Sequence, residues 1–382
     1  MRILYLGFDI NGVGGIATYS RYQIRALREL GHALTVVSVN KTDKRIVDIG
    51  VDRHFAFGDK YRATATLLAY VMRHRRAFDM VVVNHVFLAG FGYALKFAAG
   101  LPYVINVYNI DILTRLPAMR ERAFANADLV IADCQYTIDR LPQFHGRVPP
   151  TALLYDPVDV GFFRPIAKGE ARVAVAERFG LDLAGKFIAV TVASLLLPPN
   201  KGHRQTIEAM AKLADPRLLY LIVGGGPDRD DIAAHAAAHG VSGQVKLLGL
   251  VPQETLPFLY SAADVAVLVS RGGPGWGEAV PLGLIEASAC STAFICGNED
   301  GSVEAIDPAR PSGVAIAPLD IGALAEKLAA FAAAPERAHA MGRNGKDVVD
   351  AVFAFEQFRR RQGEHLAPLV ARAAGPAQKR SA

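Results

Sequence analysis

Short apolar segments alternate with helical patterns along this chain, and the alternation limits the fold more than any other feature. In the first stretch, strands are predicted at residues 2–8, 33–39, 80–86, 103–108 and 129–133, and helices at 15–30 and 61–78. Segments this short, apolar on both faces, are typical of parallel strands that helices cover on both sides. The first half of the sequence therefore predicts an α/β domain.

A linker is predicted at residues 156–165, where "DPVDVGFFRP" holds two prolines and a glycine. The alternation then restarts, with strands predicted at 187–193, 219–224, 244–249, 264–270 and 292–297, and Ala-rich helices near 228–239 and 322–333. Two doubly wound α/β domains follow, at 1–160 and 161–348, with a C-terminal helix at 349–374 packing back on the first domain and a disordered tail at 375–382. Ligands of such sheets bind at the carboxyl ends of the strands, so the cleft between the domains is the expected site.

The net charge limits the classes of partner that can be expected, and the cysteine content indicates the cellular compartment. The net charge of +5 and the pI of about 9.0 permit anionic partners, but no nucleic-acid-binding motif is present, so nucleic acid is not expected. The three cysteines, Cys134, Cys290 and Cys296, have no CxxC spacing and are expected to be buried in a reducing compartment. The N-terminus lacks a signal-peptide pattern and no apolar run of ~20 residues occurs, which predicts a cytoplasmic protein without a membrane-spanning helix.

Three glycine-rich junctions between strands and helices are candidate phosphate sites. In "FDINGVGGIATYS" (8–20), Gly14 and Gly15 would let backbone N–H groups approach a phosphate, or they would only make a tight turn. In "ASLLLPPNKGHRQTIEAM" (193–210), Lys201 suits a diphosphate, or it is a solvated surface lysine. In "LIVGGGPDRDDI" (221–232), turn chemistry with Asp228 near the helix start competes with a phosphate loop.

The segment "GWGEAVPLGLIEASACST" (275–292) places two glutamates in an apolar run. Pro281 suits the first turn of a helix, which puts Glu278 in the preceding loop and Glu286 on the second helical turn. Free backbone N–H groups at 280–283 would face an anion, and the carboxylates can accept hydrogen bonds from sugar hydroxyls. Helix-terminal acids that merely offset the dipole would explain neither the apolar surroundings nor the glycines, so a binding site is favoured.

These motifs, in this order, resemble the retaining glycosyltransferase family four, and the resemblance covers almost the whole chain. The similar segments are "GVGGIATYSRYQIRAL", "FANADLVIADCQYT", "DPVDVGFFRP", "NKGHRQTIEAM", "VGGGPDRDDI", "VKLLGLVPQETLPFLYSAADVAVLVSR", the Glu278–Glu286 segment and "CGNEDGSVEAI". The resemblance implies the GT-B fold, in which two Rossmann-like domains face each other across a cleft.

The resemblance also implies roles for individual residues. Lys201 would bind the diphosphate of a nucleotide-sugar donor, Glu278 would contact the transferred sugar and Glu286 would hold the ribose. Backbone groups at further positions would lie against the phosphates; these are Gly14, Gly15, Pro281, Leu282 and Gly283. Attack from the face of the leaving phosphate would need no enzyme nucleophile, and without a DxD motif in a suitable loop no metal or other cofactor is expected. The acceptor would be a glycan or a lipid-linked sugar of bacterial polysaccharide or glycolipid synthesis.

Several positions depart from the family pattern. Tyr108 and Asn109 stand where the family has His-Gly, so Tyr108 joins Glu278 and Lys201 as a catalytic candidate. Ser194 stands where an Arg usually assists the lysine, and losing that Arg would cost a few kcal/mol unless another cation compensates. Arg204 and Arg271 are the candidates for compensation, and Ser194 and Arg204 are included in the predicted donor site.

Three further positions bear on the resemblance. Asp156 replaces a common Asn in the linker, and Gln135 replaces an Arg. His85 matches a histidine that the family often has at the end of that strand, although a lone histidine is more often structural.

Two other functions stay open. A binding or scaffold protein with weakened chemistry would explain the changes at Tyr108 and Ser194, whereas a dinucleotide-dependent oxidoreductase lacks GxGxxG after the first strand. Basic side chains could also bring the protein to an anionic membrane, or could simply form a solvated face. They are Arg73, His74, Arg75, Arg76, Arg115, Arg120 and Arg122.

Overall fold

The protein is described here by a computed structural model that covers residues 1–12, 14–40, 50–56, 60–196, 201–273 and 277–374. The chain divides into two compact units. Unit 1 comprises Met1–Pro157 with Phe355–Ala382, and unit 2 comprises Val158–Ala354. The predicted tail at 375–382 lies outside the described residues.

Unit 1 is built on a parallel sheet in which seven strands are described, in the order β3-β2-β1-β4-β5-β6-β7. The strands are β1 (Arg2–Phe8), β2 (Ala33–Asn40), β3 (Arg53–Ala56), β4 (Met80–Val83), β5 (Tyr103–Val107), β6 (Leu129–Ala132) and β7 (Thr151–Leu153). The helices are α1 (Gly15–Glu29), α2 (Lys60–Arg73), α3 (Ala89–Ala99), α4 (Asn109–Ile112), α5 (Ala118–Ala125), α6 (Gln135–Phe144) and α14 (Phe355–Ala374).

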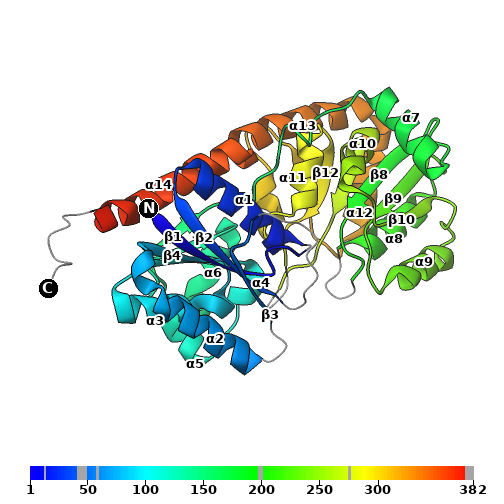
Figure 1. Cartoon of the computed structure of the whole chain (residues 1–382). Coiled ribbons are helices and arrows are strands. Elements are labelled where there is room, and N and C mark those ends of the chain that lie inside the picture. The colour runs from blue at the N-terminus through cyan, green and yellow to red at the C-terminus, as the bar shows by residue number, and fades with distance from the viewer. Residues whose placement is uncertain (13, 41–49, 57–59, 197–200, 274–276, 375–382) are drawn as a thin grey trace, which may run out of the picture. The chain divides into compact units, whose positions relative to one another are not determined.

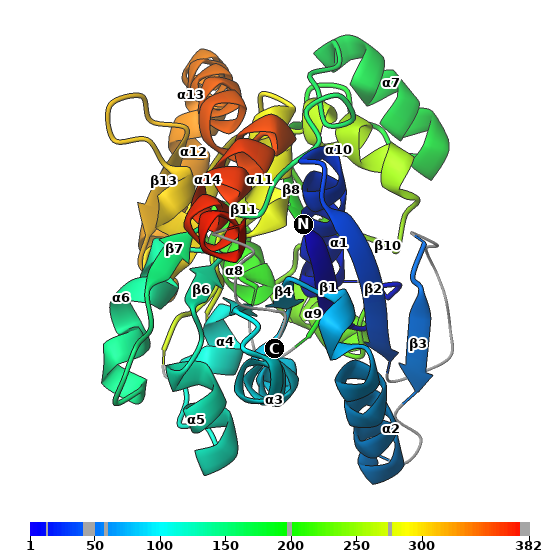
Figure 2. The same cartoon turned by 60° about the vertical axis from the view of Figure 1, so that its left-hand side comes forward.

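Alternate residues of the strands in unit 1 serve two apolar layers. Leu4 and Leu6 of β1 pack on one face, in the layer that includes residues of α2, α3 and α5, whereas Ile3 and Tyr5 pack on the other, with residues of α1 and α14. Figure 2 shows these helices on the two sides of the sheet. The chain is therefore doubly wound, as its strands, apolar on both faces, predicted.

The C-terminal helix α14 lies beside α1 in unit 1 (Figure 1). Phe358 meets Tyr19 of α1 edge-on, with 5.5 Å between the ring centroids. The guanidinium carbon of Arg25 lies 4.0 Å from the centroid of the Phe355 ring, and His365 Nε2 donates to the Leu153 carbonyl at 2.9 Å. The last helix is thus part of the core of unit 1, although it is far from the rest of that unit in sequence.

Unit 2 repeats the architecture with a parallel sheet in which six strands are described, in the order β10-β9-β8-β11-β12-β13. They are β8 (Phe187–Val192), β9 (Leu218–Val223), β10 (Val245–Gly249), β11 (Val265–Leu268), β12 (Ala293–Gly297) and β13 (Gly313–Ile316). The helices are α7 (Lys168–Phe179), α8 (His203–Leu213), α9 (Arg229–Ala238), α10 (Leu256–Ala262), α11 (Leu282–Ala289), α12 (Ile321–Ala333) and α13 (Pro335–Val348). Helices α8, α9 and α12 share one apolar layer with the strands.

The predicted strands agree with the structure to within a few residues, and β1 has the predicted limits. Three strands were not predicted, namely β3, β7 and β13, and each lies at an edge of its sheet. Edge strands are short and only partly covered, so they lack the long apolar runs by which central strands are recognised. Among the described residues, no helix is both long enough and apolar enough to cross a membrane.

Candidate functional site

The carboxyl edge of the sheet in unit 2 brings together residues from loops that follow three different strands. The strand order reverses direction between β8 and β11, which is where open α/β sheets bind ligands. Lys201 lies in the loop after β8 and Glu278 in the loop after β11. Lys201 Nζ forms an ion pair with Glu278 Oε1, and the two side chains are only 17% and 20% exposed. Two residues that the sequence analysis assigned to one site are therefore in direct contact.

Asp300, from the loop after β12, holds the backbone of Glu278 in place. Its Oδ2 accepts a hydrogen bond from the Glu278 N–H at 2.9 Å, while its Oδ1 accepts one from the Ser302 N–H at 3.0 Å. The Gly301 N–H donates to the Glu278 carbonyl at 3.0 Å, and a Cβ at Gly301 would lie 2.9 Å from the backbone of Ala279. No role was predicted for Asp300, although an Asp with a Ser two residues later is a common pattern of side-chain to backbone capping.

Burial changes the proton affinity of the charged groups at this edge. It lowers the pKa of Lys201 to about 8, and the negative charge of Asp300 opposes that effect. It raises the pKa of Asp300 to about 6, against the hydrogen bonds from Ser302. The Lys201 amino group thus still carries its proton at neutral pH, in partly desolvated surroundings where its attraction for an anion is strengthened.

Two helices that begin at this edge have N-termini suited to anions. Helix α8 follows Gly202 and α11 follows Pro281, and neither has a side-chain cap or an acidic residue in its first turn. Helix N-termini without a side-chain cap present backbone N–H groups and the positive end of the helix dipole to an anion. By contrast, α9 carries Asp230 and Asp231 in its first turn, which would repel a phosphate.

Close packing explains the glycines of α8 and α11. Gly202 has φ +87°, and a Cβ there would lie 2.4 Å from a methyl group of Val269. A Cβ at Gly283 would approach the Val192 carbonyl oxygen, at the end of β8, to 3.0 Å. Both helix N-termini are therefore held tightly against the ends of strands. Pro281, Leu282 and Gly283 lie at this N-terminus of α11, where the sequence analysis placed them.

The junction at 221–232 has a different explanation. Gly224 has φ +142°, and a Cβ there would lie 1.9 Å from the Ala193 carbonyl oxygen. A Cβ at Gly226 would lie 2.0 Å from the Leu195 carbonyl oxygen. These glycines let the loop after β9 pack on the loop after β8, which supports turn chemistry rather than a phosphate loop.

Glu286 lies on the second turn of α11, as predicted, and has a different partner from Glu278. Its Oε2 accepts a hydrogen bond from the Tyr260 hydroxyl of α10 at 2.8 Å. Burial raises the pKa of Glu286 to about 7, while this hydrogen bond opposes the shift. Tyr260 was not identified from the sequence, because a tyrosine in an apolar run indicates only a residue of the hydrophobic core. Glu278 and Glu286 thus have different partners, which favours separate roles for them over an acid/base pair.

The basic candidates near Lys201 differ in burial. Arg204 lies in the first turn of α8 and is partly buried, and its Nε has no hydrogen-bond partner among the described residues. Ser194 and Arg271 are exposed, in the loops after β8 and β11. A partly buried guanidinium with an unused donor is the better replacement for the arginine that Ser194 displaces.

In unit 1, Gly14 and Gly15 lie exposed at the N-terminus of α1. Gly14 has φ +126°, and a Cβ at either glycine would meet no atom within 4 Å. Helix α1 has no side-chain cap and no acidic residue in its first turn. This end of α1 is therefore sterically and electrostatically open to an anion.

Tyr108 lies in the core of unit 1. It is 8% exposed, its ring meets that of Tyr19 edge-on at 5.6 Å between centroids, and its hydroxyl is buried without a hydrogen-bond partner in the described part of the chain. Burial raises its pKa well above the ordinary value. These contacts favour packing over the catalytic contact that we expected of this residue.

The remaining matched positions of unit 1 also have local partners. His85 Nδ1 accepts from the Phe87 N–H at 3.2 Å and its Nε2 donates to Asp111 at 2.9 Å, so both ring nitrogens are engaged. Gln135 is exposed and donates to Asp139 at 2.6 Å. Burial and the nearby Asp133 raise the pKa of Asp156 well above its ordinary value, which favours the neutral carboxyl at the position where the family has a neutral Asn.

The chain matches two sequence-family models over most of its length. Residues 13–162 match the model described as Glycosyltransferase Family 4, and residues 177–348 match the model described as Glycosyl transferases group 1. Among curated relatives, a GDP-mannose-dependent monoacylated alpha-(1-6)-phosphatidylinositol monomannoside mannosyltransferase of Corynebacterium glutamicum is 28% identical over 301 residues, covering 77% of each chain. A D-inositol 3-phosphate glycosyltransferase of Segniliparus rotundus is 28% identical over 74% of this chain and 65% of its own.

Solved structures share the fold. The structure of a sucrose-phosphate synthase from Thermosynechococcus elongatus matches with a TM-score of 0.78 at 21% identity, over 97% of this chain and all 100% of the other. Anabaena HepE in complex with UDP matches with a TM-score of 0.81 at 19% identity, over 96% of this chain and 100% of the other. With its two Rossmann-like parallel sheets and both family matches, the chain belongs to glycosyltransferase family 4, the glycosyl transferases group 1 of GT-B fold, and is a glycosyltransferase.

Proposed function

We propose that this chain is a retaining glycosyltransferase that moves a sugar from a nucleotide-sugar donor to a glycan or lipid-linked acceptor in bacterial polysaccharide or glycolipid synthesis. The proposal is carried by the ion pair of Lys201 with Glu278 at the carboxyl edge of the sheet in unit 2, beside the uncapped N-terminus of α11. A cation, a carboxylate and free backbone N–H groups are what a sugar diphosphate requires.

Each residue would have a separate task in the reaction. Negative charge builds on the diphosphate as the sugar departs, and Lys201 with the N-termini of α8 and α11 would stabilise that charge. Arg204 would supply the second cation. As Lys201 turns to the diphosphate, Glu278 would be released to accept hydrogen bonds from the sugar hydroxyls, while Asp300 keeps its backbone in place. Because the cations of the protein itself offset the leaving charge, no metal would be required.

Glu286 would bind the ribose hydroxyls of the donor. Its carboxylate has one oxygen oriented by the Tyr260 hydroxyl, which leaves the other free to accept from a diol. In unit 1, the open N-terminus of α1 at Gly14 and Gly15 would contribute further N–H groups to the phosphates. These assignments follow the family resemblance and are consistent with the local geometry of each residue.

The relatives suggest which donors and acceptors to try first. Those of Corynebacterium glutamicum and Mycolicibacterium smegmatis are named as GDP-mannose-dependent phosphatidylinositol monomannoside mannosyltransferases. The HepE structures hold UDP, UDP with glucose, or UDP-glucose. We therefore place GDP-mannose first among candidate donors and UDP-glucose second, with a lipid-linked acceptor.

Nucleotide binding tests the donor site directly. Isothermal titration of GDP and UDP into wild-type protein and Lys201→Ala should show binding that the variant weakens at least tenfold, since a charge-assisted contact of about 1.5–3 kcal/mol is lost. Lys212→Ala, which changes an exposed lysine in the last turn of α8, is the matched control and should bind normally. Binding that is equal in all three proteins would remove Lys201 from the site.

Transfer and its stereochemistry need a second assay. Folded wild-type protein should release nucleoside diphosphate from one of the two donors, and NMR of the new glycosidic linkage should show that the donor's anomeric configuration is kept. An inverted product would contradict retention. If the protein bound a nucleotide but transferred and hydrolysed nothing across a panel of donors, the alternative of a catalytically weakened scaffold protein would stand. The family assignment argues against the oxidoreductase alternative.

A lipid-linked acceptor would place the protein at the inner face of the cytoplasmic membrane, in contact with anionic lipids. In unit 1, Phe87, Phe97 and Met119 are exposed large apolar side chains, and the Arg120 guanidinium carbon lies 4.4 Å from the centroid of the Phe87 ring. Exposed apolar groups beside arginines suit an anionic lipid surface. Phe97→Ser should reduce co-sedimentation with anionic vesicles, whereas Leu319→Ser, at an exposed position of unit 2, should not. Co-sedimentation that does not depend on the charge of the lipid vesicles would contradict this contact.

A further inference from the structure

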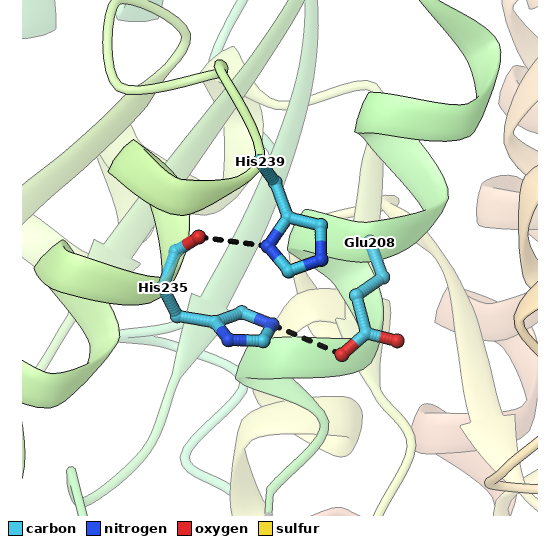
Figure 3. A group of neighbouring side chains, drawn as sticks. All are labelled: Glu208, His235 and His239. Carbon is cyan, nitrogen blue, oxygen red and sulfur yellow. Dashed lines mark hydrogen bonds and ion pairs between the residues drawn. The ribbon is translucent and has the colours of Figure 1, made fainter.

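Three potential metal ligands meet between two helices of unit 2. Glu208 lies on α8, His235 lies near the end of α9 and His239 directly follows α9. One ligand atom from each lies within 4.8 Å of the others, and no second group of this kind occurs among the described residues. Figure 3 shows both imidazole rings turned toward the Glu208 carboxylate. The two helices pack against each other, so the three positions are set by the core of the unit.

The hydrogen bond of His239 leaves the lone pair of its Nε2 available to a metal ion. Its Nδ1 lies 2.9 Å from the carbonyl oxygen of His235, and because a carbonyl can only accept, Nδ1 carries the proton. The lone pair is then on Nε2, which points toward Glu208 in Figure 3. A hydrogen bond from the second ring nitrogen to a backbone carbonyl is the usual way in which proteins orient a metal-binding histidine.

His235 is placed for the same ion. It is four residues before His239, so the two rings lie on one face of the helical turn, with their centroids 4.3 Å apart. Its Nε2 donates to Glu208 Oε1 at 2.9 Å. A metal ion would displace the proton of this hydrogen bond and bind the nitrogen and the carboxylate together, with only small side-chain rotations.

The chemistry of the three ligands selects a class of metal. Two imidazoles and a carboxylate are typical of Zn²⁺ and other first-row transition ions, whereas Mg²⁺ and Ca²⁺ prefer sites made of oxygen alone. The side chains of His235 and Glu208 are 19% and 35% exposed and His239 is exposed, so an ion can reach the site from solvent.

We propose that Glu208, His235 and His239 bind a divalent transition-metal ion, with Zn²⁺ as the first candidate, that ties α8 to α9. The histidines lie at the end of α9 that is remote from the loop after β9, whereas Lys201 lies before the first residue of α8. The ion is therefore structural rather than catalytic. By holding α8, it stabilises the helix whose N-terminus carries Lys201 and Arg204. The inference is independent of the proposed sugar transfer.

The test uses full-length protein freed of metal by a chelator. Calorimetric titration with ZnCl₂ should show one tight site per chain, and Zn²⁺ should raise the melting temperature in proportion to the logarithm of its concentration. His239→Ala and Glu208→Gln should each weaken Zn²⁺ binding at least tenfold. MgCl₂ should have no effect on melting. Co²⁺ in place of Zn²⁺ should give visible absorption bands that His239→Ala removes.

A matched control separates this site from general binding to surface histidines. His74 is also exposed and also has Nδ1 2.8 Å from a backbone carbonyl four residues earlier, that of Tyr70. His74→Ala should bind Zn²⁺ like the wild type. The proposal is overturned if wild-type protein does not bind Zn²⁺, or if His239→Ala and Glu208→Gln bind it as tightly as wild type does. His239→Ala is the key variant, because it leaves the His235–Glu208 hydrogen bond intact and should fold normally.

Discussion

Replacing Glu286 by glutamine should stabilise the ligand-free protein against unfolding. This gain over wild type should be larger at pH 8 than at pH 5. Burial on α11 raises the pKa of Glu286 to about 7, from 4.5. The folded protein thus keeps this proton up to about pH 7, whereas the unfolded chain loses it near 4.5. Between these values the stability of the wild type falls as pH rises, and above pH 7 the whole cost of ionising the buried carboxyl is present.

The magnitude follows from the same two pKa values. A rise from 4.5 to about 7 corresponds to at most about 3 kcal/mol, at 1.36 kcal/mol for each pKa unit. Because the Glu286 side chain is only partly buried, we expect about 1–3 kcal/mol. Glutamine has nearly the same volume, stays neutral, and its carbonyl oxygen can still accept from Tyr260. For a unit of this size, the gain corresponds to a melting temperature higher by about 2–4 °C for each kcal/mol.

Differential scanning calorimetry at pH 5, 6, 7 and 8 measures the effect. Glu286→Gln should melt close to wild type at pH 5 and increasingly above it toward pH 8. Glu170→Gln, at an exposed position of α7, should stay within about 0.5 kcal/mol of wild type at every pH. A difference between Glu286→Gln and wild type that is the same at pH 5 and pH 8 would refute the reasoning, since it would mean that folding does not change the proton affinity of Glu286. The same variant should bind nucleotide less tightly, as expected of a group that trades stability for function.

Three further predictions concern other positions of the two units. Affinity for a nucleoside diphosphate should fall as pH is raised from 7 to 9, because the Lys201 pKa is about 8 and only the protonated amine attracts phosphate; titration calorimetry should show this fall in wild type and not in Lys201→Met. Gly224→Ala should lower the free energy of unfolding by at least about 2 kcal/mol, because of its positive φ and the Cβ contact with Ala193, whereas Gly243→Ala, with open space around it, should be neutral in denaturant titrations. Tyr108→Phe should raise stability by about 1 kcal/mol and leave sugar transfer unchanged, since it removes a buried hydroxyl without a partner; transfer lost from a stable variant would instead establish the catalytic role.

The central strands and the α/β class could be predicted because their signal is local. A run such as that of β1 is apolar at every position after Arg2, so neither the neighbouring strand nor the covering helix is needed to recognise it. The edge strands β3 and β13 each pair with a single described neighbour in the sheet and are only four residues long. The packing of α14 on unit 1 has no local signal in the sequence, because its partners are more than 200 residues away, as in the hydrogen bond from His365 to Leu153.

Residues of the candidate site that stand in a sequence motif could be predicted. Residues that acquire their partners only through packing could not. Lys201 and Glu278 stand in recognisable segments, whereas Tyr260 and Asp300 acquire their partners only in the folded unit. The metal ligands were missed for a related reason. The spacing of His235 and His239 is a visible signal, but Glu208 is 27 residues away from His235 and reaches it only through the contact of α8 with α9.

By itself, the sequence determined the two strand–helix repeats, the positions of the glycine turns and the helix N-termini that carry no acidic residue. These follow from the residue types along a short stretch of chain. The tertiary structure decided that Lys201 pairs with Glu278, that Asp300 holds the backbone of Glu278, and that the partly buried Glu286 accepts a hydrogen bond from Tyr260. Parallel crossovers bring the carboxyl ends of distant strands to one edge, and desolvation there shifts the proton affinities, so both properties belong to the packed unit.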